Sequence, residues 1–81
     1  MTIARPDWLQ IASEARSFRQ MYRLAGEIAA SAASTGGEKR AAKRVVGSLR
    51  DVIDAPIAAA ATLAKARMCF ERLVNLLRPA P

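Results

Sequence analysis

The chain lacks histidine altogether and has a single cysteine, Cys69, among its 81 residues. Without histidine it lacks the side chain that serves most often as a general base and as a metal ligand. One cysteine cannot form an intrachain disulfide, and a zinc or iron site would have to be built from this thiol and carboxylates alone. We therefore expect no enzyme activity, no metal, no cofactor and no small-molecule substrate.

Long apolar segments are missing as well. The longest candidate, residues 52–64, contains Asp54 and Pro56 and is shorter than the ~20 residues that a membrane helix needs. The N-terminus has no basic region followed by an apolar stretch, as a secretory signal would have. These absences predict a cytoplasmic protein that does not bind a membrane. Strand-like alternation is absent too, and with it any glycine-rich phosphate loop that follows a strand.

Apolar residues three and four positions apart run through most of the chain, which is typical of amphipathic helices. The pattern predicts one all-α domain over residues 1–81, in which three helices form a hairpin or bundle that a homodimer would complete. The expected helices cover about 7–33, 38–53 and 55–77, with flexible ends at residues 1–5 and 79–81.

Polar residues mark the expected starts of these helices. A side-chain oxygen before a helix can accept a hydrogen bond from the amide three residues later. Proline lacks an amide hydrogen and is tolerated in a first turn, so it favours a restart of the chain as a new helix. The expected pairs are Asp7 with Gln10, Thr35 with Glu38, and Asp54 with Pro56.

The first expected helix is apolar over more than half of its circumference. One row runs from Trp8 to Ala32, and Met21, Leu24 and Ile28 form a second row beside it. A helix packed on one neighbour needs an apolar stripe of only ~100°. At ~1.5 Å per residue the first helix would also be far longer than the second. Both features predict contact with another chain, with Met21, Leu24 and Ile28 as apolar anchors.

The third expected helix has one main apolar face, on which Cys69 is expected to be buried as a small apolar side chain. Ile57 and Met68 fall on the opposite, otherwise polar face. Large apolar side chains there would be exposed in a monomer and favour a binding surface, although isolated exposed apolar residues are also common. The residues of the main face are Leu63, Phe70, Leu73, Val74, Leu76 and Leu77.

The net charge of +6 is concentrated in one segment, since residues 37–50 contain five basic residues and a single acid. Helical spacing places these cations on one arc around Gly47. Four of them occupy the first turns of the helix, where the helix dipole disfavours positive charge. Such a basic face predicts contact with phosphates or with an acidic protein surface, unless it is simply solvated. Its residues are Lys39, Arg40, Lys43, Arg44 and Arg50.

A second group of cations, Arg16, Arg19 and Arg23, shares one side of the first expected helix and borders its apolar arc. Arginines around an apolar strip are typical of the edge of a protein interface. They can equally extend their aliphatic stems over the margin of a core.

Three functions are compatible with these patterns. We favour a small helical regulator that binds a larger protein as an antiactivator, inhibitor or escort, with apolar anchors for affinity and arginines for orientation. A nucleic-acid-binding protein that uses the basic face is the first alternative. The second alternative is a structural subunit of a homo-oligomer.

Overall fold

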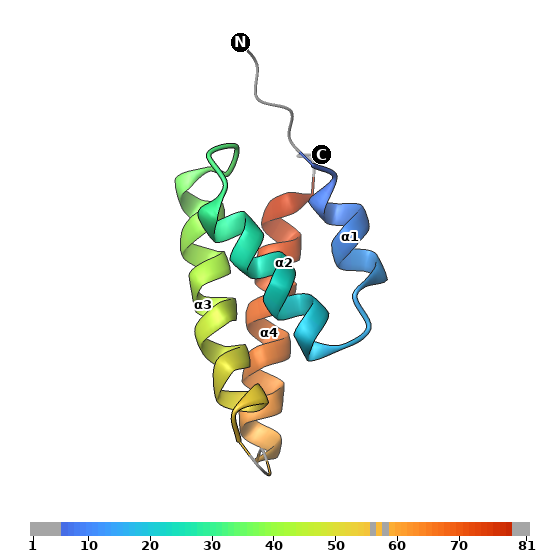
Figure 1. The fold of residues 1–81 in the computed structure, drawn as a ribbon, viewed down its shortest axis with the longest axis vertical. Helices are drawn as coiled ribbons and strands as arrows, with labels where there is room; N and C mark the ends of the chain where they lie inside the picture. The colour runs from blue at the N-terminus through green and yellow to red at the C-terminus, as the bar shows by residue number, and fades with distance from the viewer. Residues whose placement is uncertain (1–5, 56, 58, 79–81) are drawn as a thin grey trace.

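The computed structural model describes residues 6–55, 57 and 59–78. This part of the chain is all-α, as expected, but it forms four helices instead of three. Helix α3 packs against both α2 and α4, and α1 folds back to contact α2 and α4 (Figure 1). The predicted flexible ends and Pro56 lie outside the described residues. The helices are α1 (Trp8–Glu14), α2 (Phe18–Ala30), α3 (Gly36–Ile53) and α4 (Ala60–Leu77).

The prediction of one continuous first helix is wrong. The chain leaves the helical conformation at Ala15, and Ser17 is extended, with φ −130° and ψ 157°. Ser17 caps α2 through a capping box with Gln20. Side-chain atoms therefore satisfy backbone amides that a continuous helix would pair with carbonyl groups of the preceding turn.

The break explains the surplus of apolar residues in this segment. Because α1 turns back on the bundle, Trp8 and Ala12 are buried, with 2% and 6% of their surface exposed. The expected excess length of the first helix is also absent, since α2 has 13 residues while α3 and α4 have 18 each. Both sequence features that suggested a second chain are thus accounted for within one chain.

Serine and threonine side chains define the connection from α2 to α3. Helix α2 ends at Ala30, three residues earlier than expected, and the Ser34 hydroxyl donates to the Ile28 carbonyl at 2.6 Å. The predicted capping box of Thr35 and Glu38 is confirmed, with α3 starting slightly earlier, at Gly36. Local polar side chains thus stop one helix and start the next.

Helices α3 and α4 are separate, as the predicted restart requires, but the role assigned to Asp54 is wrong. Asp54 has helical dihedral angles, and its amide donates to the Arg50 carbonyl at 3.0 Å, so it ends α3 and does not cap α4. Helix α4 begins at Ala60, after an N-cap residue, Ala59, that makes no side-chain hydrogen bond.

The core lies where α2, α3 and α4 meet. Its largest fully buried side chains are Leu24, Ile28, Val45, Leu49 and Leu73. None of the helices in the described ranges is long and apolar enough to cross a lipid bilayer.

Candidate functional site

The outward face of α3 carries the predicted basic residues. Arg40, Lys43, Arg44 and Arg50 are exposed, and Lys39 is half-buried. Apolar residues of the same helix point inward, where Val45 and Leu49 are fully buried. The structure therefore has the basic face that the sequence predicts.

A hollow of about 240 Å³ lies between the N-terminal half of α3 and the C-terminal half of α4. Arg40 and Arg44 line it from α3, and Arg72 lines it from α4. Its apolar wall includes Ala41 and Leu76. Cationic and apolar side chains therefore share one concave surface.

A second hollow, of about 680 Å³, continues along the same two helices. It shares Arg44, Cys69 and Arg72 with the first hollow, and it adds Arg50 and Lys65. We call the two hollows together the α3/α4 groove. Five cations but only one carboxylate, that of Asp51, are among the described residues that line this groove. Acidic ligands are therefore favoured there.

In the middle of the α3/α4 groove, side chains of the two helices contact each other. The Ser48 hydroxyl and the Cys69 sulfur lie 3.4 Å apart. Ser48 is buried, whereas Cys69 is only half-buried and lines both hollows. The expected burial of Cys69 is therefore only partial, because this side chain packs against the margin of the core and not at its centre.

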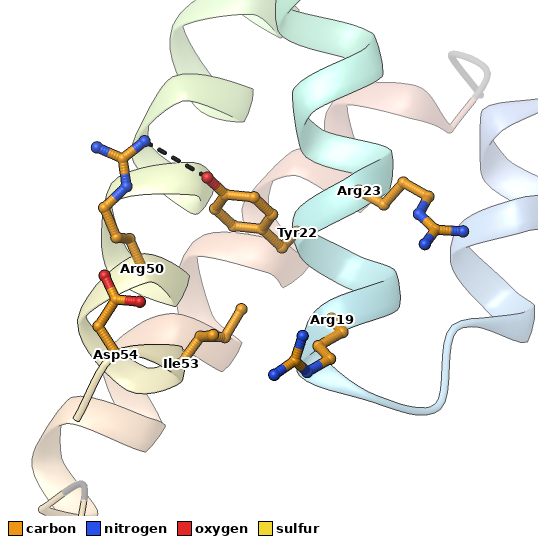
Figure 2. Close-up of a pocket in the computed structure, with 6 residues that line it drawn as sticks. All are labelled: Arg19, Tyr22, Arg23, Arg50, Ile53 and Asp54. Carbon is orange, nitrogen blue, oxygen red and sulfur yellow. Dashed lines mark hydrogen bonds between the residues drawn. The ribbon is translucent and has the colours of Figure 1, made fainter. Parts of the chain in front are cut away.

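A third hollow, of about 420 Å³, lies on the other side of α3, against α2 (Figure 2). At its edge Arg50 Nη2 donates to the Tyr22 hydroxyl at 3.4 Å, which raises the pKa of the Arg50 guanidinium above its ordinary value. Figure 2 shows Arg19 and Arg23 pointing in different directions, with Asp54 close to Arg50. The cations do not converge on one point, so the hollow does not form an anion clamp.

The apolar anchors predicted on the first helix need correction. Leu24 and Ile28 have 2% and 0% of their surface exposed and belong to the core of the monomer. Because α1 and α3 cover this side of α2, these two residues are not available to a partner. Met21 is half-buried and lines a hollow of about 430 Å³ with Phe18 and Arg67. The Arg67 guanidinium lies 5.9 Å from the centre of the Phe18 ring.

The predicted arginine rim is divided by the break between α1 and α2. Arg16 lies in the break and lines the hollow beside Met21, whereas Arg19 and Arg23 lie on α2 and line the hollow of Figure 2. All three are exposed. They do not form one continuous ridge, because Arg16 is not helical.

Large apolar side chains are exposed on the outer side of the α3–α4 hairpin. Ile57 and Met68 are 91% and 54% exposed, as their positions in the sequence predicted. Leu76 was expected in the core, but 52% of its surface is exposed. The inward stripe of α4 is complete without it, at Ala66, Phe70, Leu73 and Leu77. That helical spacing was the signal in the sequence that separates Leu76 from the core.

No group of three or more histidine, cysteine, aspartate or glutamate residues is placed to hold a metal ion in the part of the chain that the structure describes. Comparisons of the chain with models of protein families, with curated proteins and with solved structures found no match. The α3/α4 groove is the most strongly charged concave surface among the described residues.

Proposed function

We propose that this chain is a small non-enzymatic regulator that binds an acidic, partly apolar segment of a larger protein in the α3/α4 groove. The observation that carries the proposal is the combination of five cations with the exposed apolar side chain of Leu76 on one concave surface. Arginine and methionine are enriched in protein interfaces, and charged groups around such a surface speed association and orient the partner.

The proposed apolar contacts lie on α4, where Leu76 lines the groove and Met68 lies one turn from the lining residue Arg72. Met68, Arg72 and Leu76 follow one another at spacings of four residues, so they form one row along the helix. Met68 and Leu76 each expose about half of their surface. Complete burial of one fully exposed side chain of this size contributes ~1.5–3 kcal/mol to the free energy of binding. A side chain that is half-exposed before binding contributes about half of that. These two residues replace Leu24 and Ile28 as the proposed anchors.

This apolar row favours a protein over a nucleic acid. Phosphate groups would pair with Arg44 and Arg72, but they would leave Met68 and Leu76 without an apolar partner. An acidic amphipathic segment satisfies both kinds of side chain. A homodimer through the groove is disfavoured, because it would bring two sets of five cations together.

Selection from a random peptide library displayed on phage tests the proposal. The purified chain serves as bait, and the double variant Arg44→Glu/Arg72→Glu is used to remove peptides that bind elsewhere. The double variant Arg16→Glu/Arg23→Glu makes the same change in net charge outside the groove and serves as the control. We expect peptides rich in acidic and large apolar residues that bind the wild type and the control but not the groove variant.

Labelled duplex DNA in a salt series provides the opposing test. If no peptide depends on Arg44 and Arg72, the proposed function is wrong. If the chain instead binds duplex DNA at physiological salt, with a log–log salt slope of several units, then the nucleic-acid alternative holds, because each neutralised phosphate contributes roughly −0.9 to that slope.

A further inference from the structure

Gly47 lies in the middle of the outward face of α3, where it is exposed and lines the larger hollow of the groove. Glycine inside a helix lowers its stability relative to alanine, because it leaves the unfolded chain more conformational freedom. A Cβ atom built at Gly47 would meet no heavy atom within 4 Å. Packing within this chain therefore does not require glycine at this position.

The side chains around Gly47 indicate which chemical group could occupy the space beside it. Arg44 and Arg50 lie one turn before and one turn after it on α3, and Arg72 and Lys65 line the same hollow from α4. Cations therefore surround the exposed backbone of Gly47. An acidic group that approaches this position closely is near several positive charges at once.

We propose that the segment bound in the groove is an α-helix of the partner protein, acidic on one side, that crosses α3 at Gly47. This inference rests on the proposed function and specifies the partner element. Two helices approach to 8–10 Å between axes depending on the side chains at the contact, and glycine permits the shortest distance. At that distance carboxylates of the partner helix can form paired hydrogen bonds with Arg44 and Arg72.

A helix fits this site better than an extended strand. Backbone amides and carbonyls in the middle of α3 and α4 already pair within their own helices, so they cannot form a ladder with a strand. A helix, by contrast, needs only side-chain contacts. Its apolar residues would cover Leu76 and Met68 while its acidic residues face α3.

The test uses two synthetic peptides of about 18 residues, which is about 27 Å of helix at ~1.5 Å per residue. Both contain the same glutamate, leucine and alanine residues in an amphipathic order, and the second has two central alanines replaced by proline to prevent helix formation. Fluorescence anisotropy measures their affinity for the wild type, for Gly47→Ala and for Gly26→Ala. Gly26 is a matched control, because it lies inside α2, its Cβ would also meet nothing within 4 Å, and it does not line the groove.

We expect both alanine variants to raise the melting temperature by a few degrees, since alanine favours the helix. Gly47→Ala should weaken binding of the helical peptide by about tenfold or more, a loss of ~1.4 kcal/mol, and Gly26→Ala should leave it unchanged. The proline peptide should bind the wild type no more tightly than the helical peptide binds Gly47→Ala.

Three results would overturn the inference. The helical peptide could fail to bind the wild type, Gly47→Ala could bind it as tightly as the wild type does, or the proline peptide could bind equally well. If library peptides still depend on Arg44 and Arg72 in any of these cases, the groove binds an acidic segment that does not cross at Gly47 as a helix. If they do not, the proposed function itself is wrong.

Discussion

Ser17 and Gln20 hold each other at the start of α2 through two reciprocal hydrogen bonds. The backbone amide of Gln20 donates to Ser17 Oγ at 3.2 Å, and the backbone amide of Ser17 donates to the side-chain oxygen Oε1 of Gln20 at 3.0 Å. The Arg16 amide donates to the same Oε1 at 2.6 Å. Because one glutamine oxygen accepts from two successive backbone amides and Ser17 Oγ accepts from a third, side chains replace part of the helical hydrogen bonding where the chain leaves the helix. This local contact divides one apolar pattern into two helices.

The first prediction concerns this contact. Replacing Ser17 by alanine removes the cap of α2 and should lower the free energy of unfolding by ~1 kcal/mol, as loss of a serine cap usually does. Urea denaturation followed by circular dichroism measures the change. Ser13→Ala is the control, because the Ser13 hydroxyl donates only to the Gln10 carbonyl within α1. Equal stability of Ser17→Ala and the wild type would show that the cap does not position α2.

The second prediction concerns the corrected anchors. Leu24→Ala should lower the free energy of unfolding by ~2–5 kcal/mol, because it leaves a cavity in the core. Leu24→Asp should abolish the cooperative transition, because it buries a carboxylate without a partner. The matched control is Ile11→Ala on α1, where the isoleucine is 43% exposed, and it should cost far less. A stable, helical Leu24→Asp protein would show that Leu24 faces a partner and not the core.

The third prediction separates binding from stability on α4. Leu76→Ser and Met68→Ser should each change the free energy of unfolding by no more than ~0.5 kcal/mol, as is usual for exposed positions. Each should weaken binding of the helical acidic peptide several-fold, because an apolar contact is lost. Ile57→Ser is the control, since Ile57 is 91% exposed and lies outside the helical row that Met68, Arg72 and Leu76 form on α4. If Ile57→Ser weakened binding while Leu76→Ser and Met68→Ser did not, the peptide would contact the α3–α4 connection instead of α4.

The fourth prediction uses Cys69 as a reporter of occupancy. It is the only cysteine of the chain, and it lines both hollows of the groove. A bound peptide should slow its alkylation by iodoacetamide, and mass spectrometry measures the rate with and without peptide. The variant Arg44→Glu/Arg72→Glu should show no protection. An unchanged rate for the wild type at a saturating peptide concentration would place the binding site elsewhere.

The sequence by itself determined the helical class and the polar features that act locally. The basic face of α3 follows from spacing along one helix, and the Thr35–Glu38 capping box is visible as two residue types three positions apart. Ser17 and Gln20 have the same spacing, but the unbroken apolar rows on both sides of them favoured one continuous helix. Periodicity continues through a break when both halves are apolar, so it cannot locate the break.

Only the tertiary structure decided which apolar residues are covered and which cations lie close together. Leu24 became a core residue because α1 turns back and α3 packs on α2, and the apolar surplus that suggested a partner is used within the chain. The groove exists because α4 packs beside α3, so that Arg72 and Lys65 line the same hollow as Arg44. Those residues are more than 20 positions apart along the chain, and their proximity depends on the relative rotation of two helices. Spacing within one helix contains no information about that rotation.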